Sequence, residues 1–164
     1  MSFDNRLRRT LARFDRLPLS LANKAKSWAL GRTIRFVGTS GLSIDEISVD
    51  QVVVSVANEA RVQNHIGTVH AAAMALLAET ATGLALGMHL HDGAVPVIKR
   101  MSVNYVRRAV GGMRAVAQLT DAQKSSLQSD ERGEVLVPVT VTDSEGAEPI
   151  ACEMLWAWTP KRRE

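Results

Sequence analysis

The sequence contains a single cysteine, Cys152, and few aromatic residues: three Trp, three Phe and one Tyr among 164 residues. One cysteine cannot form an internal disulfide, and no group of Cys and His residues has the spacing of a metal site, so we expect no bound metal. Because aromatic side chains are scarce and no nucleic-acid-binding motif is found, we also expect no nucleic-acid partner. A lone thiol is typical of a reducing compartment, which predicts a cytoplasmic protein.

Long apolar runs are also missing. No stretch reaches the roughly 18 consecutive apolar residues of a membrane-spanning helix, and the first residues lack the apolar core of a secretory signal. Hydrophobic residues make up 46% of the chain, and a chain of this length usually forms one domain with one hydrophobic core. We therefore expect a soluble globular protein.

Positive charge is concentrated at the start of the chain. Residues 1–35 carry nine Lys or Arg against two Asp, a net charge of +7, so the rest of the chain sums to −4. Apolar residues recur every three or four positions between Phe3 and Phe14, which predicts an amphipathic helix. A second helical pattern runs from Ser20, its predicted N-cap, to Leu30.

Gly31 is expected to end the second helix. Residues 1–32 are therefore interpreted as an N-terminal helical extension, ahead of a main domain at residues 33–164. We expect the extension to dock on this domain or on a partner subunit. Because a basic amphipathic helix can also lie on an anionic membrane, peripheral membrane contact is the alternative.

The longest helical pattern runs from Val69 to about Met88 and is rich in Ala, Leu and Met. Gly67 permits a tight turn before it, and Thr68 is its predicted N-cap. The helix is apolar or small on nearly every side, so we expect it to be buried on most of its circumference. Glu79 is its one acidic residue.

Glu79 and the first amides of this helix are the groups that can carry chemistry. Burial raises the pKa of a carboxyl toward the range of a general base, although a structural Glu satisfied by Arg or by amides is the alternative. The N-terminal amides could stabilise an oxyanion, with the Asn64 side chain nearby unless it is an ordinary turn residue. Ala71 and Glu79 lie about 12 Å apart along the helix. If both act on one substrate, two subunits must each supply half of the site.

Strand patterns dominate the rest of the chain. They lie at residues 33–37, 42–58 (one or two strands), 95–108, 113–119, 134–142 and 149–159. The strands at 95–108 and 113–119 are expected to pair as a hairpin across Gly111 and Gly112. Pro138 favours an edge position or a bulge for the strand that contains it.

Residues 121–133 form the most polar stretch of the chain and are predicted to be a loop. Asp143–Gly146 are predicted to be the hairpin turn into the last strand, where Met154, Trp156 and Trp158 share one face that packs in the core or an interface. A helix that is apolar nearly all round is best buried by a sheet that curls around it. The sequence thus predicts an α+β fold with a curled antiparallel sheet around a long central helix.

Two segments resemble a known family. The run Asn64-x-x-Gly67-Thr68-Val69-His70-Ala71, followed by Glu79 and Thr80-Ala81-x-Gly83, resembles the central-helix motif of small hotdog-fold acyl-CoA thioesterases of the phenylacetate-pathway type. The segment Val103–Ala109 is similar to the strand that follows the helix in that family. The resemblance covers residues 51–158 and implies a hotdog fold in a homodimer or a tetramer.

The resemblance also implies roles for individual residues. Glu79 of one subunit would act as general base or nucleophile, the Ala71 amide of the other would polarise the thioester carbonyl, and Asn64 would position the thioester or the water. The substrate-binding turn would consist of Gly67, Thr68 and His70. The cations expected to meet the phosphates of coenzyme A, unless they are merely solvated, are Lys99, Arg107 and Arg108. Coenzyme A enters as part of the substrate, and no other cofactor is expected.

The motif departs from the family at two places, which leaves alternatives open. Ala71 and Ala72 replace a common glycine pair, and Glu79 stands where Asp is usual. A non-catalytic protein that binds an acyl group or another apolar ligand is therefore an alternative to acyl-CoA hydrolysis. Dehydratase chemistry is another alternative, because His65 and Glu79 are fourteen residues apart, which resembles the spacing of the His/Glu dyad in hotdog acyl-carrier-protein dehydratases. The Pro and Gly residues that usually follow the His in those enzymes, and the Gln that follows the Glu, are absent here. The thioester carrier is either coenzyme A or acyl carrier protein.

Overall fold

The computed structural model describes residues 3–161. Its helices are α1 (Arg6–Ala12), α2 (Leu19–Thr33), α3 (Arg35–Ser40), α4 (Ala71–Gly87) and α5 (Asp121–Ser129), with a short 3₁₀ turn at Ala60–Val62. Its strands are β1 (Ser43–Ile47), β2 (Val52–Val56), β3 (Ala94–Tyr105), β4 (Met113–Ala117), β5 (Gly133–Val137), β6 (Val139–Asp143) and β7 (Ile150–Pro160).

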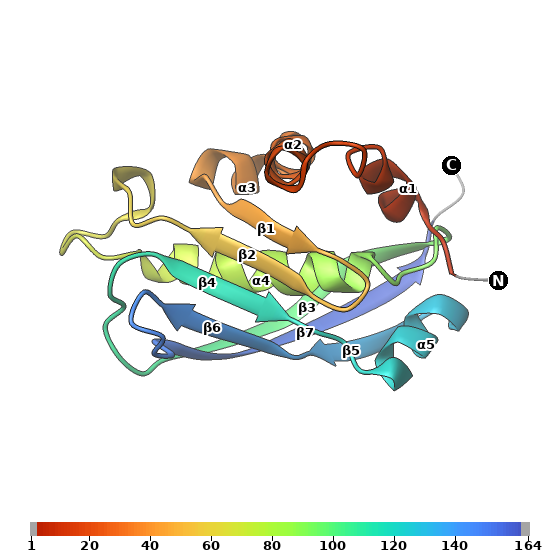
Figure 1. Cartoon of the computed structure of the whole chain (residues 1–164). Helices are drawn as coiled ribbons and strands as arrows, with labels where there is room; N and C mark the ends of the chain where they lie inside the picture. The colour runs from red at the N-terminus through yellow and green to blue at the C-terminus, as the bar shows by residue number, and fades with distance from the viewer. Residues whose placement is uncertain (1–2, 162–164) are drawn as a thin grey trace.

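The strands form two antiparallel sheets that curl around α4. Their orders are β1-β2-β4-β6 and β3-β7-β5. Figure 1 shows the sheets following one another around α4, which lies along their concave side, with α1, α2 and α3 above β1. A long helix wrapped by a curled antiparallel sheet is the hotdog fold, so the predicted fold class is confirmed.

Helix α4 is the centre of the hydrophobic core. It begins and ends within two residues of the predicted bounds, and Leu77, Ala78, Ala81 and Leu86 on it are fully buried. The three side chains expected to share a buried face of β7 do so: Met154, Trp156 and Trp158. Because each fully buried large apolar side chain contributes about 1.5–3 kcal/mol, packing holds α4 in place. In the part of the chain that the structure describes, no helix is long and apolar enough to cross a membrane.

The strands pair differently from the predicted hairpins. Strand β3 pairs with β7, whereas β4 pairs with β2 and β6, so the hairpin predicted across Gly111 and Gly112 is wrong. The strand predicted at 134–142 is split at Pro138, which has no N–H to donate to a sheet. Strand β5 before it pairs with β7, and β6 after it pairs with β4. The chain therefore changes sheet at Pro138, before the predicted turn at 143–146.

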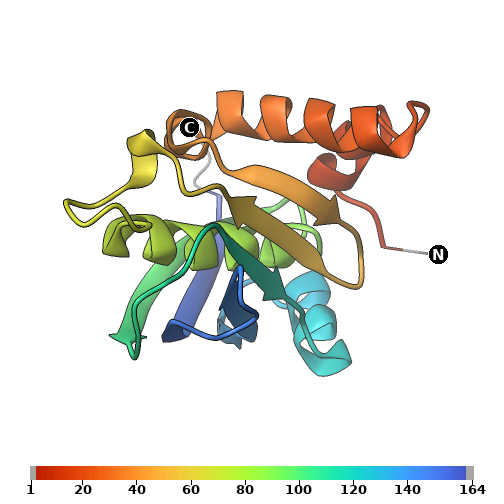
Figure 2. The same ribbon diagram turned by 60° about the vertical axis from the view of Figure 1, so that its left-hand side comes forward.

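Helix α2 is longer than predicted and covers the edge of β1 (Figure 2). Its N-cap is Pro18 rather than Ser20, and it continues through Gly31. The Ser27 hydroxyl accepts a hydrogen bond from the Ile44 amide of β1 at 2.8 Å. An uncovered edge strand invites pairing with other chains, and α2 removes this possibility at β1.

The strand predicted at residues 33–37 is wrong, because these residues lie at the end of α2 and in α3. A Cβ atom on Gly31 would lie only 3.0 Å from the Cα of Gly38. The two glycines therefore allow α2 and α3 to approach more closely than other residues would. This packing overrides the β propensity of Thr33 and Ile34.

Helix α1 docks on the C-terminal end of α4. The Asn5 side chain donates to the carbonyl oxygens of Gly87 at 2.9 Å and Leu90 at 2.8 Å, and Arg8 Nε donates to that of Met88 at 2.6 Å. The last carbonyls of a helix have no intrahelical partner, so α1 supplies the missing donors. The expected docking of the N-terminal segment on the domain is confirmed for α1.

The polar stretch 121–133 is largely helical, which corrects the predicted loop. Thr120 and Gln123 form a capping box: the Gln123 amide donates to the Thr120 hydroxyl, and the Thr120 amide donates to the Gln123 side chain. Leu127 on this helix is fully buried. A good cap and one apolar anchor suffice to form the short helix α5.

Candidate functional site

The loop before α4 is held by the side chain of Asn64. Its Oδ1 accepts hydrogen bonds from the amides of Ile66 and Thr68, each at 3.1 Å, and its Nδ2 donates to the Thr68 hydroxyl at 2.9 Å. Gly67 has a φ of +76°, which closes the turn without the strain that a side chain would cause. Both polar atoms of the Asn64 side chain are thus used within the loop. This geometry favours a positioning role for Asn64, and its contact with a thioester stays a prediction.

His70, rather than the predicted Thr68, is the N-cap of α4. Its Nδ1 accepts a hydrogen bond from the Ala72 amide at 3.0 Å, and its carbonyl accepts from amides of the first turn. The Ala71 amide is left without an acceptor among residues 3–161, at the positive end of the helix dipole. A free donor at this point is what the predicted oxyanion role of Ala71 requires.

Tyr105, which no sequence motif marks as a site residue, supports the start of α4. Its hydroxyl donates to the Ala71 carbonyl oxygen at 2.9 Å. Because Tyr105 is the last residue of β3, this bond ties the strand to the first residue of the helix. The two residues are 34 positions apart, and no local pattern connects them.

Glu79 lies about two turns further along α4, about 12 Å from Ala71. Its side chain is partly buried, and this burial raises the pKa of its carboxyl above the ordinary value. The neighbouring Thr80 side chain lowers the pKa of Glu79 by a smaller amount, although the buried Thr80 hydroxyl has no partner within hydrogen-bonding geometry among the described residues. Within the described residues no cation forms an ion pair with Glu79. The alternative of a structural Glu neutralised by an Arg is therefore not seen within one chain.

The side of α4 that carries Glu79 is only partly covered by the rest of the chain, and it is most open toward the start of the helix. Ala72 is exposed, and Ala75 and Leu76 are only partly buried. Strand β3, which contacts α4, has a neighbouring strand on one side only within residues 3–161 and presents its other edge along 12 residues. Exposed apolar side chains on β3 include Val95, Val97, Met101 and Tyr105. Within the described residues of one chain, apolar side chains on the open side of α4 therefore lack full burial, and the backbone N–H and C=O groups on the free edge of β3 lack hydrogen-bond partners in a sheet.

The predicted phosphate-binding cations lie in and after β3. Lys99 forms an ion pair with Glu134, and Arg107 forms one with Glu145 at 3.2 Å. Arg108 is exposed and makes no ion pair among the residues described. All three are accessible to an anionic ligand. No cluster of His, Cys, Asp or Glu within the described chain could hold a metal ion.

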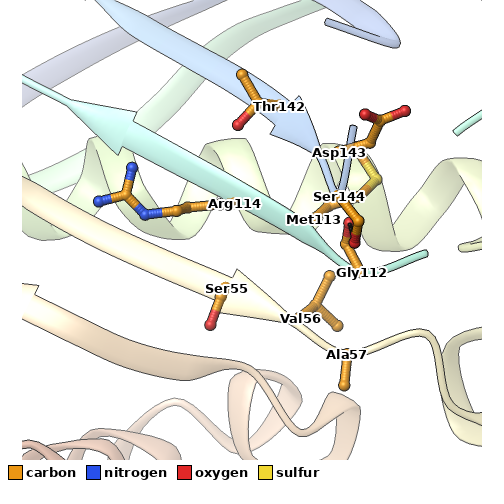
Figure 3. Close-up of a pocket in the computed structure, with 9 residues that line it drawn as sticks. All are labelled: Ser55, Val56, Ala57, Gly112, Met113, Arg114, Thr142, Asp143 and Ser144. Atoms are coloured by element: carbon orange, nitrogen blue, oxygen red, sulfur yellow. Dashed lines mark hydrogen bonds between the residues drawn. The ribbon is translucent and has the colours of Figure 1, made fainter. Parts of the chain in front are cut away.

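Two surface pockets lie outside this arrangement. Figure 3 shows the first, of about 370 Å³, at the ends of β2 and β6 and the start of β4, with the polar side chains of Ser55, Arg114 and Thr142 in its lining. The second, of about 540 Å³, lies between α1, α2 and the C-terminal end of α4, with apolar walls that include Leu7 and Leu30. Neither contains a residue of the predicted site.

The chain matches one known protein family. Residues 22–158 match the family described as a domain of unknown function, DUF4442. This match spans most of the chain, so the protein belongs to that family. No curated protein matches the chain.

Solved structures share the fold at low sequence identity. A Pseudomonas aeruginosa protein of unknown function, described as a probable thioesterase, is 23% identical with a TM-score of 0.73, covering 88% of this chain and 97% of its own. A Haemophilus influenzae thioesterase is 17% identical with a TM-score of 0.64, covering 88% and 92%. A Staphylococcus aureus thioesterase mutant is 20% identical with a TM-score of 0.64, covering 77% and 99%.

Proposed function

We propose that the protein is a thioesterase that hydrolyses an acyl-CoA or another acyl-carrier thioester at a site shared between two copies of the chain. The observation that carries this proposal is Glu79: a partly buried carboxyl with a raised pKa, on the open side of α4 and without an ion pair in the described chain. A carboxylate in this condition can accept a proton from water near neutral pH. Proteins of the same fold that are described as thioesterases support the reaction class.

Two copies are needed because one helix cannot bring both groups to one carbonyl. The Ala71 amide and Glu79 of one chain are about 12 Å apart, whereas each must come within about 3 Å of the reacting atoms. The free edge of β3 offers the surface for a second copy, because its unpaired N–H and C=O groups can extend the sheet. A two-fold axis at this edge would bring the open sides of the two α4 helices together. The start of one helix would then approach Glu79 of the other.

In this arrangement Glu79 removes a proton from water while the water oxygen attacks the thioester carbon. The Ala71 amide of the other copy donates a hydrogen bond to the oxyanion that forms. The carbon–sulfur bond then breaks, the sulfur takes the proton that Glu79 removed from water, and a carboxylic acid and a free thiol leave while Glu79 returns to its ionised form. Direct attack by the Glu79 carboxylate, with an anhydride intermediate, is the other route that the same geometry allows.

The surrounding residues position these groups and the substrate. The turn that orients the Ala71 amide is held by Asn64, Gly67, Thr68 and His70. Lys99, Arg107 and Arg108 are the cations available for the phosphates of coenzyme A. The resemblance to phenylacetate-pathway enzymes makes small and aromatic acyl-CoA esters the first substrates to test.

The first experiment is thiol release from short, long and aromatic acyl-CoA esters by the wild type and the Glu79→Gln variant. Loss of the base should lower the rate about 10²- to 10⁴-fold with the fold intact. Glu131→Gln, which removes an exposed carboxylate outside the site, is the matched control and should keep the wild-type rate. An unchanged rate for Glu79→Gln would overturn the mechanism. Single-turnover hydrolysis in ¹⁸O-water distinguishes the routes, because label enters Glu79 only if an anhydride forms.

A complementation experiment tests the shared site directly. Ala71→Pro removes the free amide, and the change is compatible with the first helical position and with the extended backbone of His70, whose ψ is 143°. The Glu79→Gln and Ala71→Pro variants should each be inactive alone. A mixed dimer would contain one intact site, so co-expression should restore hydrolysis. A monomer in solution, or no restoration from a confirmed mixed dimer, would refute the shared site.

A second candidate function is binding of an acyl or other apolar ligand without catalysis. It is favoured by the methyl groups of Ala71 and Ala72, which narrow the approach to the helix start, and by the apolar pocket of about 540 Å³. Calorimetric binding of acyl-CoA without thiol release from any ester would support it.

A further inference from the structure

The N-terminal helices present an apolar surface that the proposed reaction does not use. Trp28 is 64% exposed, Phe36 is 61% exposed and Leu21 is 53% exposed. These are large side chains, and all three lie in α2 or at the start of α3. Large apolar groups gathered on a surface usually mark an interaction site.

Cations alternate with these apolar groups on the outer side of α2. Leu21, Lys24, Trp28 and Arg32 are spaced by three, four and four residues, which places them on one face of the helix. The guanidinium of Arg32 stacks over the Trp28 ring at 5.2 Å. Ala22, Lys26 and Leu30 on the other side are buried, and Figure 2 shows no element of the chain above the outer side of α2. We name the exposed residues Leu21, Lys24, Trp28, Arg32, Arg35 and Phe36 the α2–α3 face.

The cations of this face are not neutralised within the described chain. Lys24, Arg32 and Arg35 form no ion pair among residues 3–161. Acidic groups on the neighbouring elements have other partners: Asp15 pairs with Lys26 at 2.7 Å, Asp45 accepts a hydrogen bond from Ser55 at 3.0 Å, and Glu46 accepts one from Gln51 at 2.8 Å. The positive charge of the α2–α3 face is therefore available to an external anion.

The cations of α1 are different in this respect. Arg9 forms ion pairs with Asp4 at 2.9 Å and with Asp92 at 2.7 Å, and Arg8 donates to the end of α4. They serve to dock α1 on the domain. Of the other cations in this segment, Arg6, Arg13 and Arg16 are also exposed and form no ion pair among residues 3–161, but only the α2–α3 face combines unpaired cations with large exposed aromatic rings within the described segment.

We propose that the α2–α3 face docks the protein on the surface of a bilayer that contains anionic lipids. Long cationic side chains can reach phosphate and carboxylate headgroups while Trp, Phe and Leu enter the boundary with the acyl chains. The phosphates of a nucleic acid would pair with the cations, but the aliphatic side chain of Leu21 would be left without an apolar partner. The combination of unpaired cations and exposed apolar groups on one helix face fits an anionic lipid surface. This inference is independent of the proposed hydrolysis.

The test uses the full chain with vesicles of phosphatidylcholine alone and with about one third phosphatidylserine. Of the three Trp residues only Trp28 is exposed, because Trp156 and Trp158 are buried. Binding should therefore shift the Trp28 fluorescence to the blue and permit its quenching by brominated lipid. Co-sedimentation should be strong with the anionic vesicles at about 0.1 M salt and weak at about 0.5 M salt.

Matched variants separate charge at this face from charge elsewhere. A cation near an anionic surface increases affinity about five-fold, so Lys24→Gln with Arg32→Gln should weaken vesicle binding about twenty-five-fold. Arg114→Gln with Arg132→Gln changes the net charge equally at two exposed cations outside the face and should keep most of the affinity. Trp28→Ala should weaken binding about tenfold without changing the far-ultraviolet spectrum.

Each of the other outcomes overturns the proposal. Equal binding to neutral and anionic vesicles would remove the role of charge, and equal losses in the two double variants would make the attraction nonspecific. Binding to DNA or to another protein in place of vesicles would assign the face to a different partner. Unchanged Trp28 fluorescence on bound vesicles would place the contact elsewhere on the molecule.

Discussion

At Gly83 in α4, helix propensity and tertiary packing predict opposite effects of the same substitution. Replacing Gly by Ala inside a helix stabilises it by about 1 kcal/mol. A Cβ atom at Gly83, however, would lie 2.8 Å from two ring carbons of Trp156. The indole ring is nearly fully buried, and its Nε1 donates to the Thr82 hydroxyl at 3.0 Å. The ring therefore cannot move away freely.

The magnitude follows from these contacts. Overpacking of a close-packed core costs about 1–3 kcal/mol, and loss of the Trp156 hydrogen bond would add about 1 kcal/mol if the ring moved. The gain in helix propensity leaves a net cost of about 0–2 kcal/mol if the ring keeps its hydrogen bond and about 1–3 kcal/mol if it loses it. We therefore expect Gly83→Ala to lower the free energy of unfolding by about 1–2 kcal/mol, the range that the two cases share. For a chain of this length this corresponds to a fall in Tm of about 2–8 °C.

Urea unfolding at a fixed protein concentration measures this change, because the stability of an oligomer depends on concentration. Gly87→Ala in the same helix is the control. A Cβ atom there would meet only the end of the Leu7 side chain, at 3.1 Å, which can adjust. Gly87→Ala should therefore be as stable as the wild type or slightly more stable. If Gly83→Ala is as stable as the wild type or more stable, the Trp156 ring can make room for the methyl group, and tight packing at Gly83 is wrong as an explanation.

Three further predictions concern the site and the N-terminal helices. Burial raises the pKa of the Glu79 carboxyl, and the base acts in its ionised form. The hydrolysis rate should therefore rise with pH, with a midpoint above the usual pKa range of Glu. A midpoint at or below that range in a pH–rate profile would contradict a buried base. Arg108→Gln should raise the KM for acyl-CoA about tenfold or more, but should not raise the KM for the same acyl group on a phosphate-free thiol. The control Arg114→Gln should change neither KM. Equal effects of Arg108→Gln on both substrates would exclude a contact with the phosphates. Gly38→Ala should destabilise the protein by about 2 kcal/mol, because its Cβ would lie 2.6 Å from the Gly31 carbonyl oxygen. If the variant unfolds at the wild-type Tm, α2 and α3 can move apart without loss of stability.

Local signals account for the parts of the fold that were predicted. The composition of residues 71–87 specifies a helix, and its lack of a polar face specifies burial, so α4 and its place at the centre of the sheet were predicted. The helix rise alone also required a distance of about 12 Å between Ala71 and Glu79. The capping box of Thr120 and Gln123 was present in the sequence as a readable signal for α5, although the polarity of the stretch favoured a loop.

The failures occurred where distant residues decide the outcome. Residues 33–37 carry β-branched side chains, but the close approach of Gly31 and Gly38 makes the segment helical. The partner of β3 is β7 rather than the next strand along the chain, and strand pairing of this kind leaves no local pattern. At the site, no sequence pattern indicated that Tyr105 would bond to Ala71.

The amino-acid sequence alone was enough to predict the elements with strong local periodicity and the spacing of groups along one helix, because both depend on residues a few positions apart. It also supplied the residue types of the candidate site. The tertiary structure decided which strands pair, which side of α4 stays open and which amide stays free. It also decided which cations of the basic segment are used in docking α1 and which remain exposed on α2. These properties depend on burial and on contacts between residues far apart in the chain, which only the folded arrangement defines.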